Sequence, residues 1–170
     1  VYDRKKAVNP VSRWTMEAVK MLVKDIMSRS VKTVSADTRM FEVVSQMCLY
    51  RYSGLPVVGD NDELVGMIAE KDVLHYLFPT LEDLMGNIAA INLDEMMDKY
   101  QDVVKLKVEE IMHPKVITVD PDMHIMKATS IMVKHRFRRI PVADGNTLVG
   151  MMSLGDVHKA IYQANISKMI

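Results

Sequence analysis

The clearest signature of structure in this chain is LVGMIAEKDV at residues 64–73, which returns as LVGMMSLGDV at residues 148–157. In both copies an apolar run with a central glycine leads into a polar segment and an Asp-Val pair. Beyond this signature, an offset of 85 residues makes eleven of the 34 positions from Asp25 to Val58 identical to positions in the second half. Unrelated sequences would match at roughly two of them. The chain is therefore a tandem repeat.

Each repeat has the same order of expected elements. A short β-branched stretch, residues 31–34 or 116–119, is expected to form a strand, and a polar turn and a helix follow it. A strand, a tight turn, a second strand and a closing helix come next. The positions predicted to face the core on these helices are Phe41, Val44, Met47, Cys48, Val73, Leu74 and Leu77 in the first repeat and Ile125, Ala128, Ile131, Met132, Val157, Ala160 and Ile161 in the second. The predicted fold class is α+β, with two β-α-β-β-α units in tandem.

The repeats and the residues around them predict four segments. These are a tail with a short helix (1–22), a first unit (23–78), an insertion (79–105), and a second unit with a C-terminal tail (106–170). Apolar residues recur at helical spacing through the insertion, so it is predicted to form one or two amphipathic helices. The first residue is Val1, as expected for a processed product or an excerpt of a longer protein.

Composition limits the classes of function. The chain has 22 Lys and Arg residues against 22 Asp and Glu, and this zero net charge argues against a protein that binds duplex DNA. The longest apolar runs fall far short of the ~20 residues that a membrane helix needs. The single cysteine, Cys48, cannot form an internal disulfide and is expected to be a small core residue. These features predict a soluble, cytoplasmic globular protein.

The sequence offers no catalytic or metal-binding motif. It contains neither G-x-G-x-x-G nor G-x-x-x-x-G-K-[ST], and its five histidines include no H-x-x-x-H pair. No adjacent cysteine pair is available to hold zinc. We therefore predict that the chain is not an enzyme and has no metal site.

Ser153, Gly155 and Asp156 form the strongest candidate binding site. A serine at a helix start can cap one backbone N–H while the remaining amides and the positive end of the dipole attract an anion such as phosphate. Gly155 has no side chain, so a ligand could approach the backbone closely. Asp156 can accept hydrogen bonds from both vicinal hydroxyls of a ribose. A plain capping box would explain Ser153 and Asp156 equally well, and this alternative stays open.

The first repeat departs from this pattern, because Ala69 stands where the second repeat has Ser153. No side-chain cap is available there. Asp72 could still bind a ribose and Lys71 a phosphate, so we expect a site that is weaker, different in ligand or empty. An ordinary exposed helix start is the alternative.

The ordered motifs, present twice, resemble the cystathionine-β-synthase (CBS) domain pair, known as the Bateman module. The resemblance covers roughly Val23–Phe78 and Val108–Tyr162. It implies two units packed sheet to sheet about a pseudo-twofold axis, with two clefts that hold adenosine derivatives such as AMP, ADP, ATP, S-adenosylmethionine or NAD(H). It also implies a homodimer formed through the CBS helices.

The resemblance further implies that each cleft mixes residues of both repeats. The stronger site would then contain Val31, Lys32, Thr33, Tyr52, Ser53, Gly54, Ser153, Gly155 and Asp156. The weaker site would contain Lys71, Asp72, Val116, Ile117, Thr118, Phe137, Arg138 and Arg139. Tyr52 and Phe137 could stack on a base or simply pack in the core. Arg138 and Arg139 could bind phosphate or form a solvated helix end.

The function that follows is regulatory binding of an adenine nucleotide, most simply AMP, ADP or ATP, without catalysis. Ligand binding would act through different affinities for two arrangements of the protein. The alternative is a dimerisation or interaction scaffold whose nucleotide sites are vestigial.

Overall fold

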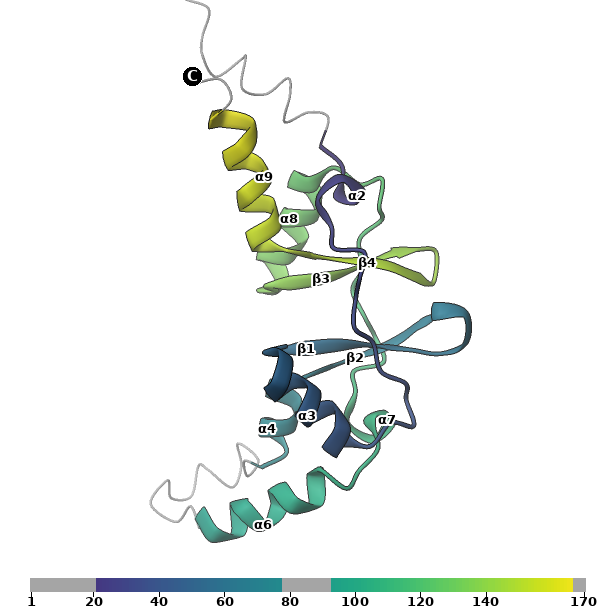
Figure 1. Cartoon of the computed structure of the whole chain (residues 1–170), viewed down its shortest axis with the longest axis vertical. Helices are drawn as coiled ribbons and strands as arrows, with labels where there is room; N and C mark the ends of the chain where they lie inside the picture. Colours follow the sequence, from purple (N-terminus) through teal and green to yellow (C-terminus); the bar gives the residue numbers. More distant parts are fainter. Residues whose placement is uncertain (1–20, 78–92, 167–170) are drawn as a thin grey trace, which may run out of the picture. The chain divides into compact units, whose positions relative to one another are not determined.

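The computed structural model describes residues 21–77 and 93–166 (Figure 1). Most of the helix predicted within residues 1–22 lies outside the described residues, and so do residues 79–92 of the predicted insertion. In chain order the elements are α2 (Val23–Ile26), α3 (Met40–Tyr50), β1 (Gly54–Val58), the 3-10 turn η1 (Asp60–Asp62), β2 (Leu64–Ala69), α4 (Glu70–His75), α6 (Leu93–Val103), α7 (Val108–Ile111), α8 (Ile125–His135), β3 (Arg139–Asp144), β4 (Thr147–Ser153) and α9 (Leu154–Ile166).

The chain forms two compact units, each built around one hairpin. Of the described residues, the hairpin-1 unit holds 32–77 and 93–116 and contains β1 and β2. The hairpin-2 unit combines residues 21–31 with residues 117–166 and contains β3 and β4. The units are therefore offset from the sequence repeats, because the opening segment of each repeat belongs to the unit of the other.

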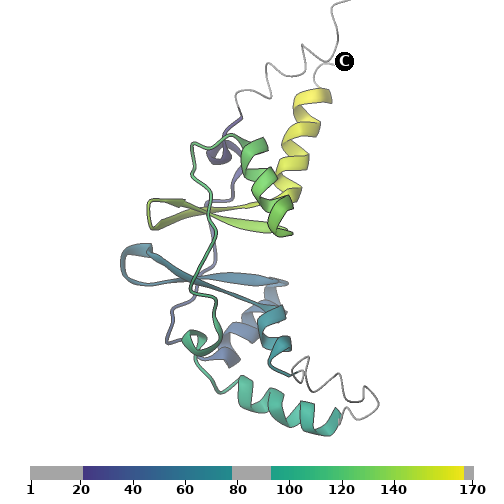
Figure 2. The same ribbon diagram turned by 180° about the vertical axis from the view of Figure 1, so that it is seen from behind.

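Each unit is a layer of helices on one face of a two-stranded antiparallel sheet. Leu55 pairs with Ile68 in the first hairpin, and Ile140 pairs with Met152 in the second, and all four side chains are buried. Because successive side chains of a strand point to opposite faces, these pairs define the core face of each sheet. Figures 1 and 2 show α8 and α9 side by side on one face of the β3–β4 hairpin. The α+β class predicted from the sequence is confirmed.

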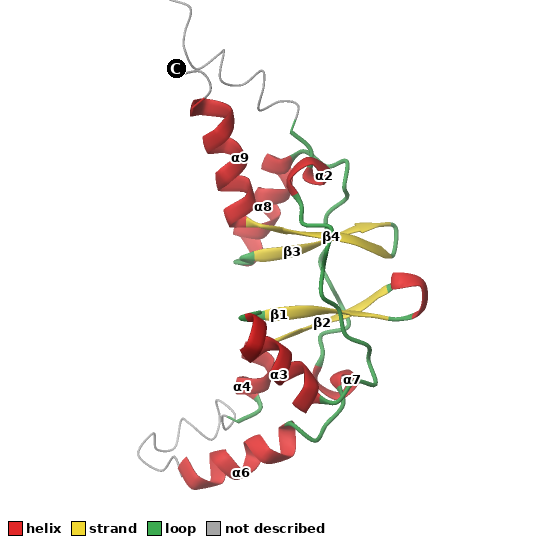
Figure 3. Ribbon diagram, viewed as in Figure 1, coloured by secondary structure: helices red, strands yellow, loops and turns green. Residues whose placement is uncertain are grey.

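The strands predicted at residues 31–34 and 116–119 are wrong, since each is reduced to a single bridge residue and drawn as loop (Figure 3). Val34 donates its N–H to the Pro56 carbonyl at 3.1 Å, and its own carbonyl accepts from the Val58 N–H at 2.9 Å. Extending this parallel ladder backward would require an N–H on Pro56, which proline lacks. Val119 and Pro141 repeat the arrangement in the second hairpin.

The core face of α3 differs from the predicted one by one position. Met47 is buried as predicted, but it is joined by Met40 and Val43, whereas Phe41 is 66% exposed and Cys48 is also exposed. The prediction that Cys48 is a core residue is therefore wrong. The two candidate faces have the same helical spacing, so periodicity alone could not separate them.

The other helices agree better with the sequence pattern. Ile125, Ala128 and Met132 of α8 are fully buried, as predicted. On α4, Val73 is buried but Leu74 is half exposed, so the predicted core position of Leu74 is wrong. A helix of six residues presents less than two turns to the core, which leaves room for few inward positions.

A glycine in each hairpin makes room for a segment of the opposite repeat. A Cβ added to Gly150 would lie 2.6 Å from the Met27 Sδ and 3.0 Å from the Ser28 carbonyl oxygen. Ser28 exchanges two backbone hydrogen bonds with Met151, each of 2.9 Å. The hairpin-1 unit repeats this contact, with a Cβ on Gly66 falling 2.7 Å from the Met112 Sδ. Each sheet is thus completed by the segment that follows α2 or α7.

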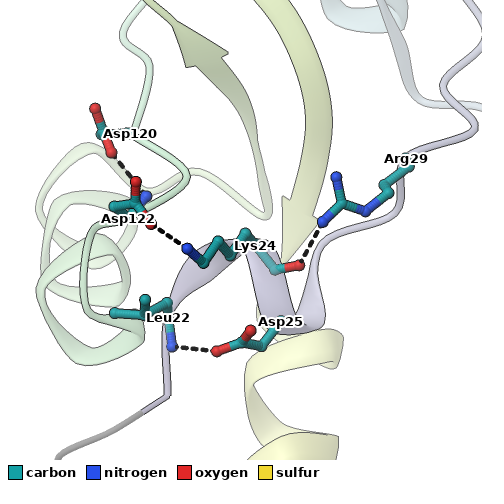
Figure 4. A network of polar contacts seen from close by, with 6 residues as sticks. All are labelled: Leu22, Lys24, Asp25, Arg29, Asp120 and Asp122. Atoms are coloured by element: carbon teal, nitrogen blue, oxygen red, sulfur yellow. Dashed lines mark hydrogen bonds and ion pairs between the residues drawn. The ribbon is translucent and has the colours of Figure 1, made fainter.

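Polar contacts fasten α2 to the hairpin-2 unit (Figure 4). The Lys24 ammonium forms an ion pair with Asp122, and the Lys24 N–H donates to the Pro121 carbonyl at 2.9 Å. The hydrogen bond and the charge of Asp122 raise the pKa of Lys24. The Asp25 carboxylate accepts a hydrogen bond from the Leu22 N–H at 2.9 Å and so caps the start of α2. The opening segment of the first repeat is therefore held in place by main-chain and side-chain contacts.

Candidate functional site

The start of α9 carries the capping arrangement predicted for Ser153. The Ser153 Oγ accepts a hydrogen bond from the Asp156 N–H at 3.1 Å. In return, Asp156 Oδ2 accepts from the Ser153 N–H at 2.8 Å and from the Ser153 hydroxyl at 2.6 Å. The capping box is real, and it orients the Asp156 carboxylate.

The two oxygens of this carboxylate differ in their contacts. Within the described residues no hydrogen bond reaches Asp156 Oδ1, since the contacts of Ser153 all go to Oδ2. Next to it, a Cβ added to Gly155 would have the Ser153 Oγ, at 3.5 Å, as its nearest neighbour. The backbone is therefore accessible at the amino end of α9, a helix of 13 residues with its positive dipole end at this point. The capping box and a ligand role are compatible.

Two arginines lie beside this helix start. Arg139 stands directly opposite Ser153 in the β3–β4 ladder, and the Leu154 N–H donates to the Arg138 carbonyl at 3.1 Å. Directly opposed residues of an antiparallel pair project from the same face of the sheet, so Arg139 and Ser153 share a face. Both arginines are exposed. Both belong to the same unit as Asp156, and their expected place beside Asp72, in a cleft shared by the two repeats, stays a prediction.

The equivalent helix start in the hairpin-1 unit has a different chemistry. The Ala69 N–H donates to Asp72 Oδ2 at 2.8 Å, so half of the capping box is present. The other oxygen, Asp72 Oδ1, lies 2.9 Å from the His113 Nε2. Gly54 stands opposite Ala69, where the second hairpin has Arg139 opposite Ser153. This end thus lacks both the hydroxyl and the guanidinium, and its carboxylate is already engaged.

The remaining predicted residues divide between the units. The hairpin-1 unit holds Lys32, Thr33, Tyr52, Ser53, Gly54, Lys71, Asp72 and Val116. The hairpin-2 unit holds Val31, Ile117, Thr118, Phe137, Arg138, Arg139, Ser153, Gly155 and Asp156. Within the hairpin-1 unit, the Ser53 carbonyl accepts from the Glu70 N–H at 3.2 Å, so Ser53 lies at the start of α4. The grouping of residues from both units into shared clefts stays a prediction.

Tyr52 and Phe137 pack against the cores of their own units. Each ring is partly buried against the buried apolar residues of its hairpin. The Tyr52 ring stacks on Tyr50 with 5.8 Å between centroids, and the Phe137 ring stacks on His135 at 5.4 Å. These contacts favour the packing role for both rings.

His113 is the residue that sequence reasoning missed. It aligns with Ser28 in the repeat, and this substitution of a long polar side chain for a short one was the available signal. The alignment could not show that the ring reaches Asp72, which lies 41 residues earlier in the chain.

The described residues were also searched for membrane spans, metal sites and grooves. No helix in residues 21–77 and 93–166 is both long and apolar enough to cross a bilayer. In the same ranges no three His, Cys, Asp or Glu side chains gather closely enough to hold a metal ion. An open groove of about 520 Å³ lies between α3 and α6 in the hairpin-1 unit, lined by Phe41, Val44, Ser45, Cys48, Tyr100, Gln101, Val104 and Lys105.

Two segments of the chain, residues 23–79 and 108–163, match the family model of the CBS domain. Together they cover about two thirds of the chain, so the protein belongs to the CBS domain family and carries the domain twice. An uncharacterized protein of Methanocaldococcus jannaschii is 33% identical over 155 residues, covering 83% of this chain and 91% of its own. The CBS domain-containing protein YhcV of Bacillus subtilis is 30% identical over 135 residues, covering 79% of this chain and 81% of its own.

Solved structures of CBS pairs have the same fold. The crystal structure of CBSX2 in complex with AMP matches with a TM-score of 0.65 and 23% identity, over 84% of this chain and 96% of that one. The CBS domain pair of protein MJ0100, in complex with 5′-methylthioadenosine and S-adenosyl-L-methionine, matches with a TM-score of 0.60 and 24% identity, over 84% and 97%.

Proposed function

We propose that this chain is a regulatory module that binds an adenosine-containing nucleotide at the start of α9 and catalyses no reaction. The observation that carries the proposal is the open Oδ1 of Asp156, on a carboxylate that the Ser153 cap holds in a fixed orientation. A carboxylate accepts hydrogen bonds strongly, and two vicinal hydroxyls are suitable donors. Asp156 is therefore the proposed acceptor for the ribose diol.

The neighbours of Asp156 would contact the phosphate of the ligand. Gly155 lets a phosphate group approach the backbone, and the amide groups at the start of α9 favour its negative charge. Arg139 shares a face with Ser153, and a guanidinium binds phosphate oxygens in a forked geometry. We assign Arg139, and Arg138 beside it, to phosphate contact at this site.

The ligands named for related CBS pairs support the adenosine class. CBSX2 was solved with AMP, and the MJ0100 pair with 5′-methylthioadenosine and S-adenosylmethionine. The chemical group that these compounds share is adenosine with its ribose diol, whereas the phosphate belongs to AMP alone. The diol acceptor is thus the common requirement, and the arginines favour a phosphorylated member of the class.

We further propose that the cleft is completed as the family resemblance implies. Val31, Lys32 and Thr33 would contact the adenine edge, and Ser53 and Gly54 would line the opposite wall. The module would act in the cytoplasm as a homodimer formed through its helices.

A dimerisation scaffold with vestigial sites is the second candidate. The observation that favours it is the exposure of large apolar side chains on the helices, such as Leu49 at 76% on α3 and Val133 at 65% on α8. A scaffold of this kind would dimerise without any nucleotide.

Calorimetric titration and thermal unfolding with AMP, ADP, ATP, S-adenosylmethionine and NADH test the proposal. A nucleotide at 100 times its dissociation constant should stabilise the folded protein by about 2.7 kcal/mol. Asp156→Asn should weaken binding about 10- to 100-fold, because a charge-assisted hydrogen bond is lost. Asp144→Asn, an exposed carboxylate at the β3 turn, is the matched control and should bind normally.

The sugar provides a second arm of this experiment. AMP should bind more tightly than 2′-deoxy-AMP, and Asp156→Asn should remove that preference. A flat response to every compound, with dimerisation intact, would favour the scaffold instead.

A further inference from the structure

His113 is anchored by the strand beside it. Its N–H donates to the Met67 carbonyl at 2.9 Å, and its carbonyl accepts from the Met67 N–H at 3.0 Å. The preceding residue, Met112, fits into the space that Gly66 leaves open. The position of the His113 backbone is therefore set by β2, and its ring extends from a fixed point.

The ring lies over the Asp72 carboxylate. Because an ionised carboxylate can only accept hydrogen bonds, the His113 Nε2–H is the donor in the 2.9 Å contact with Asp72 Oδ1. The His113 side chain is 64% exposed, while that of Asp72 is only 8% exposed. With Oδ2 bound to the Ala69 N–H, both carboxylate oxygens have protein partners.

The second repeat leaves the equivalent place open. Ser28 takes the position of His113 and exchanges the same two backbone hydrogen bonds, in its case with Met151. Within the described residues its side chain makes no hydrogen bond to Asp156, whose Oδ1 stays open. One residue in the repeat thus separates a covered carboxylate from an available one.

We propose that His113 is a built-in block of the first site, occupying the carboxylate oxygen that a ribose diol would need, so that each chain binds one nucleotide. The inference rests on the proposed function, since it assumes that Asp156 binds the diol. A nucleotide at Asp72 would have to displace a hydrogen-bonded ring, whereas within the described residues no side chain is hydrogen-bonded to Asp156 Oδ1. Exchange of the two residues between the repeats should therefore exchange the properties of the two sites.

A reciprocal swap tests this, with AMP and S-adenosylmethionine as probes in calorimetric titrations of the full chain. Wild type should bind one equivalent per chain. His113→Ser should add a second event, which Asp72→Asn removes, and in an Asp156→Asn background it should restore binding. Ser28→His should weaken binding about 10- to 100-fold, the loss expected when a charge-assisted hydrogen bond must be replaced. His75→Ser changes an exposed histidine of α4 and should leave one event unchanged.

The outcomes separate the two proposals. Two equal events in wild type, or one event in both wild type and His113→Ser, would overturn the block while leaving the binding function intact. Unchanged affinity in Ser28→His would also overturn it. No binding in any variant would overturn both proposals, whereas binding by His113→Ser alone would support the block and reject Asp156 as the functional site. Circular dichroism of each variant checks that the fold is retained.

Discussion

Asp72 and Asp156 occupy the same position of the repeat, yet the atoms around their carboxylates differ. Each accepts a hydrogen bond from the N–H of the residue three positions earlier. Asp156 also has the Ser153 hydroxyl beside it and a glycine before it, whereas Asp72 has His113 across its second oxygen. Equivalence in sequence therefore does not carry over to equivalence in chemistry.

Replacing Gly155 with alanine should raise the stability of the protein and lower its affinity for the nucleotide. Gly155→Ala should stabilise α9 by up to about 1 kcal/mol, because alanine is the better helix former, and the new methyl group meets nothing closer than 3.5 Å. The same methyl group would stand where the ligand approaches the backbone, so affinity for AMP should fall. Thermal unfolding and titration of one variant measure both effects. Unchanged affinity would mean that the nucleotide does not contact the backbone at this point.

The candidate site could be predicted only in part, for reasons visible in single residues. Ser153 and Asp156 were predictable because a capping box is local in sequence and its residues lie three apart. The contribution of His113 was not, since it depends on a long-range contact. The pairing of Arg139 with Ser153 was not predicted either, since it depends on the register of β3 and β4.

Among the elements, the two hairpins and their helices were predictable, since turn residues and alternating apolar residues mark them. The orientation of α3 was not predictable from periodicity, because Met40, Val43 and Met47 recur with the same spacing as the set beginning at Phe41. The repeat itself contained the answer. Met40 aligns with Ile125 and Val43 with Ala128, both buried on α8, so the two helices read together would have selected the correct face.

The glycines of β2 and β4 yield a prediction about these elements. Gly150→Ala should destabilise the folded protein by about 1–3 kcal/mol, because the added methyl group would overlap the Met27 side chain and press on the Ser28 carbonyl. Chemical denaturation measures the change in the free energy of unfolding. Gly59→Ala is the control, because its Cβ would meet only a Val65 methyl group at 3.4 Å. Equal effects at the two positions would show that close packing of the Met27 segment is not the cause.

At the scale of the whole molecule, the two repeats exchange their opening segments, so that each core contains residues of both repeats. Val108 of the second repeat is fully buried in the core of the hairpin-1 unit, together with Val103 at the end of the insertion. Val23 and Met27 are buried in the hairpin-2 core, although they precede the first hairpin. The sequence could predict the order of the elements but not this exchange, because a repeat records which residues are similar and not which ones touch.

Cutting the chain between the two repeats tests whether each unit needs the segment contributed by the other repeat. Two fragments separated within residues 78–92 should each be unfolded alone and should fold together when mixed. Loss of Val103 and Val108 from the hairpin-1 core would cost about 3–6 kcal/mol, which is comparable to the whole stability of a small domain. Circular dichroism of the separate and mixed fragments measures this. Cooperative unfolding of either fragment by itself would contradict the prediction.

The exchanged segments also limit which genetic rearrangements of such a chain would leave a folded product. If a recombination event removed one repeat, the surviving hairpin would lose the Met27 or Met112 segment that completes its sheet, and the glycine beneath would face solvent. A half-gene product would therefore be selected against before any ligand mattered. The pair of repeats, and not the single repeat, is therefore the smallest piece of this chain expected to be gained or lost with its fold intact.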